Sequence, residues 1–243
     1  MSAYAALAGG YDALTGDVPY EALAEWYQAA FSRAEEAVHT VLDLGCGTGT
    51  LSLLLAERGY ELICADPSAD MLSVFSQKLW ELPEGCVRPM LLCQSAQELD
   101  LYGTVEACVS SLDAFNYLPP EDIPGVLHRL RLFIAPGGVL AFDFLSPEHM
   151  RSLDGQCFVD EEDGAFCVWR ASVEEGVLRY GLDLFSPERH GLYRRGQEEH
   201  SEYIHEPAFL ISALEAEGFG DIALHSDGPQ HEQGRLFLTA RRK

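Results

Sequence analysis

Three glycines at alternate positions, Gly45, Gly47 and Gly49, come directly after an apolar run from Val41 to Leu44. Because glycine has no Cβ, the backbone of such a turn can lie close to a ligand. A helical pattern of leucines follows, and the amides at a helix N-terminus would point at whatever the turn holds. These residues predict a buried strand, a ligand-binding turn and a helix. A corner without a ligand is the structural alternative, although three glycines in five residues are more than a simple turn needs.

Two carboxylates stand near this turn. Asp43 lies inside the predicted strand, and Asp66 ends the next apolar run. A carboxylate at the end of a strand can accept hydrogen bonds from ligand hydroxyls, but Asp66 before Pro67 can equally cap the following helix. Asp43 also has a structural alternative, a carboxylate that ties the strand to the turn. A dinucleotide motif GxGxxG would need glycine where this chain has Thr50.

The order of these features resembles the class I S-adenosylmethionine-dependent methyltransferases, in particular small bacterial enzymes related to deoxysugar and glycine N-methyltransferases. Residues 43–49 are similar to the family's first motif, and Asp66 stands where the family carries an acid for the ribose hydroxyls. Ser95-Ala96-Gln97 stands where the family flanks adenine, and residues 135–138 are similar to its turn before strand five. The resemblance implies S-adenosylmethionine as cofactor, bound by Tyr11, Asp43, Gly45, Cys46, Gly47, Asp66, Pro67, Met71, Ser95, Ala96, Gln97 and Ser111.

The acceptor side follows from the same resemblance, because residues after the fourth strand face the methyl group and cap tyrosines lie over the cofactor and acceptor. It implies a site lined by Tyr20, Leu112, Asp113, Asn116, Tyr117, Tyr180, Arg194 and Tyr203. The catalytic residue stays unknown, with Asp113, Tyr20 and His200 as candidates. Plainer alternatives are Tyr11 and Tyr20 as core anchors, Asn116-Tyr117 as a polar loop with a packing tyrosine, and His200 as a surface residue.

Methyl transfer from a sulfonium is an in-line displacement at carbon, and it depends mainly on alignment and exclusion of water. A base is needed only if the acceptor arrives protonated. Because the cofactor is cationic and has no phosphate, acids and backbone suit it better than lysine or arginine. Residues 110–113 lack the D/N-P-P-Y motif of amino-directed nucleic-acid methyltransferases. The alternatives are a non-catalytic module that binds the cofactor or a partner, and, with less support, a nucleic-acid methyltransferase.

The net charge is −23, from 39 acidic and 16 basic residues among 243. Such a surface repels phosphate backbones and anionic membranes, so we expect a small-molecule acceptor and no nucleic acid or membrane as partner. No apolar run approaches the ~18 residues of a membrane span, and the N-terminus lacks a signal-peptide pattern, so we expect a cytoplasmic protein. The seven cysteines include no CxxC pair, which indicates neither a disulfide framework nor a metal site.

Strand and helix signals alternate and predict an α/β Rossmann-like fold with helices on both faces, in which the resemblance implies a mainly parallel seven-stranded sheet. The expected strands cover residues 41–44, 61–66, 89–93, 105–110 and 139–144, and a C-terminal β-hairpin covers 222–226 and 234–240. Residues 165–173, 177–186 and 191–203 alternate apolar and polar side chains and predict an antiparallel strand insertion. We expect one domain with an N-terminal helical cap (1–38), a core (39–147 and 207–243) and a strand lid (148–206). The lid is also a candidate homodimer interface.

Overall fold

The computed structural model describes residues 11–162 and 164–243, so the first ten residues of the expected cap lie outside the described part. The main sheet has seven strands in the order β10-β11-β5-β4-β1-β2-β3. Strands β1 to β5 are parallel to one another, whereas β11 is antiparallel to both of its neighbours. The strands are β1 Thr40–Leu44, β2 Glu61–Asp66, β3 Met90–Cys93, β4 Val105–Ser110, β5 Ile134–Leu145, β10 Phe219–His225 and β11 Arg235–Arg242.

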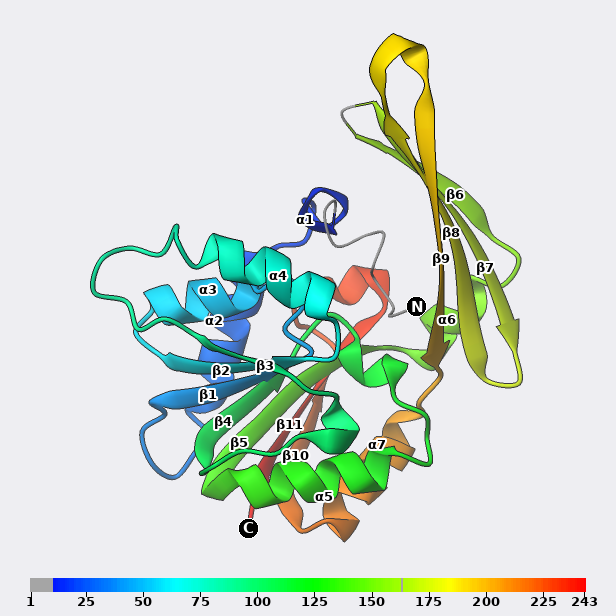
Figure 1. Ribbon diagram of the computed structural model, residues 1–243. Helices are drawn as coiled ribbons and strands as arrows, with labels where there is room; N and C mark the ends of the chain where they lie inside the picture. The colour runs from blue at the N-terminus through cyan, green and yellow to red at the C-terminus, as the bar shows by residue number, and fades with distance from the viewer. Residues whose placement is uncertain (1–10, 163) are drawn as a thin grey trace.

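Helices cover both faces of this sheet (Figure 1). One face carries α2 Tyr20–Phe31, α3 Thr50–Glu57 and α4 Ala69–Lys78, and the other carries α5 Ile123–Phe133 and α7 Pro207–Ala216. An apolar core lies on each side, which explains why the parallel strands are apolar on both faces. The predicted α/β fold with a mainly parallel sheet and a C-terminal hairpin is confirmed. Within the described ranges, no helix is long and apolar enough to cross a membrane.

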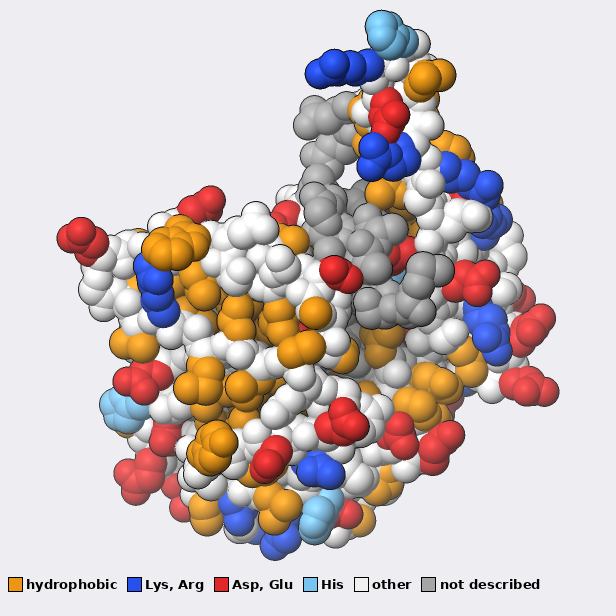
Figure 2. All heavy atoms as spheres, in the orientation of Figure 1, with side chains coloured by type: hydrophobic (Ala, Val, Ile, Leu, Met, Phe, Trp, Pro, Cys, Tyr) orange, Lys and Arg blue, Asp and Glu red, His pale blue; other side chains and the backbone are white. Residues whose placement is uncertain are grey.

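A second, antiparallel sheet of four strands projects from the core as an arm (Figure 1). The arm consists of β6 Cys157–Glu162, β7 Ala165–Glu174, β8 Val177–Pro187 and β9 Tyr193–Tyr203, and α6 Pro147–Ser152 precedes it. The alternation of apolar and polar residues predicts β7, β8 and β9. It does not predict β6, because residues 157–161 are all exposed, so neither face of this strand needs apolar side chains. Acidic side chains are spread over both the core and the arm, as expected from the net charge (Figure 2).

Strand β5 is longer than the sequence predicts. It passes through Pro136-Gly137-Gly138, where a turn is expected, and it begins directly after α5 ends at Phe133. Gly138 allows this continuation, because a Cβ there would lie 2.7 Å from the carbonyl oxygen of Glu106 on the neighbouring β4. Residues typical of a turn are thus used for close pairing of two strands.

Gly138→Ala should lower the free energy of unfolding by about 1–3 kcal/mol, because the backbone oxygens of Glu106 and Ala135 cannot move aside for the new methyl group. Gly125→Ala is the matched control: it lies exposed in α5 with no atom within 4 Å of an added Cβ. This control should raise the free energy of unfolding by about 0.5–1 kcal/mol. Urea unfolding measures both values, and equal effects would contradict the close pairing at Gly138.

Candidate active site

A cavity of about 370 Å³ opens at the carboxyl ends of β1, β2, β3 and β4. The strand order changes direction between β1 and β4, and ligands of open α/β sheets bind at such a point. Every predicted cofactor residue except Asp43 lines this cavity, and so do Tyr20, Leu112 and Tyr117 of the predicted acceptor set. The structure therefore brings the glycine turn and the loop after β4 around one space.

The glycine turn keeps its backbone open to this space. Gly45, Gly47 and Gly49 have φ angles of 77°, 53° and 79°, a conformation that favours glycine. The carbonyl oxygen of Ala65 accepts the amides of Gly45 (2.8 Å) and Cys46 (3.2 Å) and fixes the turn to β2. A Cβ at Gly47 would meet no atom within 4 Å, because this residue borders the cavity.

Asp66 lies on the cavity wall at the end of β2. Its Oδ2 accepts the amide of Gly47 (2.9 Å), and its Oδ1 accepts the amide of Ser68 (2.8 Å). Burial raises the pKa of Asp66 above its usual value, while these two amides oppose the rise. The N-cap of α4 is Ser68, whose hydroxyl accepts the amide of Met71 (3.3 Å), so Asp66 is not the capping residue. Each carboxylate oxygen keeps a lone pair for a ligand hydroxyl.

Asp43 lies beneath the turn and not on the cavity wall. It is 1% exposed, its Oδ2 accepts the hydroxyl of Ser52 on α3, and its Oδ1 is buried without a hydrogen-bond partner. Burial raises the pKa of Asp43 to about 7. The hydroxyl of Ser52 thereby links Asp43 of β1 to the helix that follows the turn.

The short helix α1, Tyr11–Leu14, belongs to the expected N-terminal cap and is tied to the glycine turn by polar contacts. Asp12 accepts hydrogen bonds from Thr48 (2.5 Å) and Thr50 (3.3 Å), and Lys78 of α4 donates to it (2.8 Å). These contacts hold Tyr11 at the cavity. Sequence reasoning misses Asp12 and Lys78, although Lys78 is one of only two lysines in the chain.

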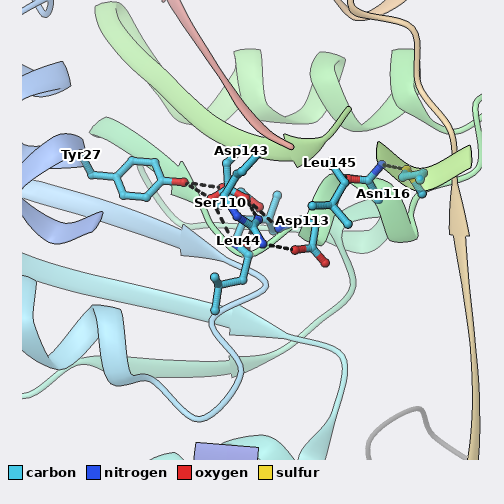
Figure 3. A network of polar contacts seen from close by, with 10 residues as sticks. Tyr27, Leu44, Ser110, Asp113, Asn116, Asp143 and Leu145 are labelled. Carbon is cyan, nitrogen blue, oxygen red and sulfur yellow. Dashed lines mark hydrogen bonds and ion pairs between the residues drawn. The ribbon is translucent and has the colours of Figure 1, made fainter. Parts of the chain in front are cut away.

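The loop after β4 contains two residues other than glycine in the left-handed region, Leu112 (φ 55°) and Asp113 (φ 56°). Asp143 on β5 holds them there: its carboxylate accepts the amides of Leu112 (3.0 Å) and Asp113 (2.8 Å) (Figure 3). The hydroxyl of Tyr27 on α2 donates to the same carboxylate (2.7 Å). Such a backbone conformation costs about 1–3 kcal/mol per residue, so it depends on these bonds.

Arg235, the first residue of β11, pairs with two carboxylates of this network. Its guanidinium donates to Asp143 and to Asp113 (2.7 Å), and the residue is only 8% exposed. Burial lowers the pKa of Arg235, but Asp143 and Asp113 outweigh it, so the guanidinium keeps its charge. Asp113, a catalytic candidate from the sequence, is therefore ion-paired and does not line the cavity.

Other predicted acceptor residues lie elsewhere. Asn116 is fully buried; its amide donates to the carbonyl of Tyr203 (2.9 Å) and accepts from the amide of Leu145 (2.9 Å), which joins the arm to β5. Arg194 is exposed beside the turn between β8 and β9 and pairs with Glu188. Neither Asn116, Arg194 nor Tyr203 lines the cavity.

His200 and Tyr180 face each other across β8 and β9 and also lie outside the cavity lining. His200 is buried, so the surface alternative is wrong: its Nδ1 lies 3.5 Å from the hydroxyl of Tyr117, and its Nε2 lies 3.1 Å from a carboxylate oxygen of Glu198. Burial lowers the pKa of His200, although Glu198 opposes this. Sequence position alone gives no sign that this histidine contacts a cavity residue.

Further cavity residues escape the sequence analysis. Thr48 and Ser68 lie next to a predicted motif, so their position in the sequence could have indicated that they line the cavity. Phe115 and Leu118 cannot be told from ordinary core residues in the sequence. The residues not predicted are Leu44, Thr48, Thr50, Leu51, Ala65, Ser68, Gln94, Ser110, Ala114, Phe115 and Leu118. In the part of the chain that the structure describes, no three His, Cys, Asp or Glu side chains are grouped as a metal site.

Residues 41–138 match the family model of the methyltransferase domain. The chain contains a methyltransferase domain, and its motifs and fold are similar to those of class I S-adenosylmethionine-dependent methyltransferases. The matched segment contains the glycine turn, Asp66 and the loop after β4, which line the cavity together with Tyr11 and Tyr20 from outside this segment. The resemblance noted in the sequence is thereby confirmed, and S-adenosylmethionine is the cofactor.

The similarity to other methyltransferases covers nearly the whole of this chain. The chain is 27% identical to the putative methyltransferase YqeM of Bacillus subtilis (strain 168), over 98% of this chain and 97% of that protein. Its fold is similar to that of a S-adenosylmethionine-dependent methyltransferase from Clostridium acetobutylicum ATCC 824, with a TM-score of 0.84, 22% identity and 98% of each chain covered. It is also similar to the sugar N-methyltransferase KedS8 from Streptoalloteichus sp ATCC 53650, with a TM-score of 0.79, 21% identity, and 96% of this chain and 93% of that one covered.

Asp66→Ala should weaken S-adenosylmethionine binding about 10- to 100-fold, because a hydrogen bond to a charged group contributes ~1.5–3 kcal/mol and the Gly47 amide also loses its acceptor. Asp100→Ala, at an exposed position outside the cavity, is the control and should bind like the wild type. Isothermal titration calorimetry measures both dissociation constants. An unchanged value for Asp66→Ala would contradict a role in cofactor binding.

Asp43→Asn should gain stability relative to the wild type as the pH rises from about 4 to about 7. Because folding raises the pKa of Asp43 from 3.8 to about 7, the stability that its proton provides is complete below pH 3.8 and lost towards pH 7. The loss reaches at most about 1.4 kcal/mol per pH unit, and asparagine does not titrate. Urea unfolding at both ends of this range measures the difference between variant and wild type. A difference independent of pH would show that Asp43 ionises normally.

Proposed function

We propose that the enzyme transfers a methyl group from S-adenosylmethionine to a small-molecule acceptor by in-line displacement. The cavity of about 370 Å³ carries this proposal, because its volume is typical of small-molecule sites. The glycine turn and Asp66 form one part of its wall, and tyrosines with the loop after β4 form another. This division suits a cofactor next to a small acceptor.

The residues around the glycine turn fit the chemistry of the cofactor. Asp66 would accept hydrogen bonds from the ribose hydroxyls, and Ser95-Ala96-Gln97 would flank the adenine. None of the described residues that line the cavity is lysine or arginine, which suits a cationic ligand without phosphate. When bound, the cofactor supplies a methyl group that its sulfonium has already activated.

The protein's own contribution is alignment and exclusion of water. Tyr11 and Tyr20 border the cavity from the N-terminal segment, and Leu112 and Tyr117 border it from the loop after β4. Burial raises the pKa of Tyr20 above its usual value, so its hydroxyl stays protonated at neutral pH and can orient an acceptor. In this proposal the arm serves as the lid of the acceptor site.

Charge and comparison both support a small acceptor. A net charge of −23 disfavours nucleic acid, whose binding depends on basic side chains. The similar structure KedS8 is a sugar N-methyltransferase, which acts on a small molecule. A cytoplasmic location and the absence of nucleic-acid partners belong to the same proposal.

Gly47→Val should abolish S-adenosylmethionine binding, because its side chain would enter the cavity. Gly59→Val is a matched control: Gly59 also has a positive φ and open space around its Cβ, but it lies outside the cavity lining. Calorimetry measures binding, and transfer of a labelled methyl group to the low-molecular-mass fraction of a bacterial extract measures activity. No cofactor binding by the wild type would refute the proposal, and binding without labelled product would indicate a non-catalytic module.

A further inference from the structure

The ion pair between Asp12 of α1 and Lys78 of α4 joins elements that surround the cavity. The Nζ atom of Lys78 donates to Asp12 (2.8 Å), and it also donates to the hydroxyls of Thr50 (2.8 Å) and Thr48 (3.4 Å). Both hydroxyls donate in turn to Oδ1 of Asp12. An ammonium group has three protons, so this arrangement uses all of them. The four side chains form one closed network between α1, the glycine turn with the start of α3, and α4.

Two helix ends explain why these charges meet here. Lys78 is the last residue of α4, where a cation is favourable. The first turn of α3 has neither a side-chain cap nor an acidic residue of its own, so the carboxylate of Asp12 supplies the negative charge that a helix N-terminus favours. The side chain of Asp12 is 44% exposed and that of Lys78 is 19% exposed, so water reaches the pair and dissolved salt weakens it.

Helix α1 depends on contacts of this kind for its position. It has 4 residues, far fewer than the ~12 that an isolated helix needs to be stable in water. It lies beside β6 of the arm and apart from the helices that cover the main sheet (Figure 1). The network around Asp12 therefore ties a small, separate element to the glycine turn.

The elements that the network joins also line the cavity. Thr48 and Thr50 border it from the glycine turn and α3, and Tyr11 borders it from α1. The carbonyl oxygen of Tyr11 accepts the amide and the hydroxyl of Thr15 (3.0 Å each). The hydroxyl of Tyr20, another residue of the cavity wall, donates to Thr15 (3.1 Å). A movement of α1 away from the glycine turn would therefore change the cavity wall at both tyrosines.

We propose that Asp12 and Lys78 are positioning residues that form a latch. By holding α1 and Tyr11 against the glycine turn, the latch slows the departure of S-adenosylmethionine and of S-adenosylhomocysteine, its demethylated product. The proposal builds on the cofactor part of the proposed function and not on the identity of the acceptor. When the latch opens, the glycine turn keeps its hydrogen bonds to Ala65 of β2, so a ligand can still enter. The latch therefore acts on dissociation more than on association.

Surface plasmon resonance with the immobilised enzyme measures the association and dissociation rate constants of both ligands. Lys78→Met removes the charge but nearly keeps the length of the side chain. This variant should raise both dissociation rate constants about 3- to 10-fold, because an ion pair and its hydrogen bonds are lost. The association rate constants should stay within about twofold of the wild type. A general loss of folded protein would instead lower the amount of ligand bound at saturation.

Arg58→Met is the matched control. Arg58 pairs with Glu21 over the same distance, 2.8 Å, is 20% exposed and lies outside the cavity lining. Breaking this ion pair should leave both dissociation rate constants unchanged.

Exchange of the two charges tests the pair itself. Asp12→Lys and Lys78→Asp should each speed dissociation, because each variant brings two like charges together. The double variant should return the rate constants to within about twofold of the wild type, since the neighbouring threonine hydroxyls can donate or accept.

Salt tests the latch in the wild type without a change of sequence. Raising the ionic strength from about 0.02 to about 0.5 M should speed dissociation more in the wild type than in Lys78→Met, which has no ion pair left to screen. The comparison removes the effect of salt on the acidic protein as a whole.

The outcomes separate the two proposals. Three results would overturn the latch and leave the proposed function standing: equal dissociation from Lys78→Met and the wild type, an equal increase in Arg58→Met, or a double variant no better than the single ones. A wild type that binds neither ligand would overturn the cofactor site on which both proposals rest.

Discussion

The buried carboxylate of Asp143 is the group on which the shape of the site depends. It accepts hydrogen bonds from the amides of Leu112 and Asp113, from the hydroxyl of Tyr27 and from the guanidinium of Arg235. These partners belong to the loop after β4, to α2 and to β11, so one side chain joins the beginning, middle and end of the chain. Without it, two residues with positive φ would have no compensation for their strained backbone. Hydrogen bonds and charge therefore hold the strained part of the loop that borders the cavity.

The direction of the last strand matters for the same reason. Strand β11 is antiparallel to β5, and Arg235 lies opposite Leu145. The first residue of β11 therefore lies at the carboxyl end of β5, where the loops that follow the parallel strands also lie. A parallel strand would place its last residue there instead. The C-terminal hairpin thus brings a cation to a site that the parallel part of the sheet surrounds with acids.

An acidic chain must satisfy its buried carboxylates, and at two of them this enzyme does so with backbone amides. Asp66 and Asp143 each accept two of them, and both residues border or support the cavity. Among the described carboxylates, only Asp43 and Glu202 keep a buried oxygen without a hydrogen-bond partner. One lies beneath the glycine turn and the other on β9 of the arm, and burial raises the pKa of both carboxyls.

The sequence by itself determined the strands and helices of the core, the glycine turn and Asp66, because apolar periodicity and the special backbone of glycine are local properties. It also indicated Tyr20, Leu112 and Tyr117 through their place after a strand or in the cap. It could not reveal Asp143, Tyr27 and Arg235 as one network, because Asp143 lies 116 residues from Tyr27 and 92 from Arg235. Position along the chain also does not decide which way a side chain turns. Three residues predicted at the acceptor site therefore have other surroundings: Asp113 is ion-paired, Asn116 joins the arm to β5, and Arg194 is exposed. Only the tertiary structure placed His200 beside Tyr117, because that contact exists only once β9 lies against the loop after β4.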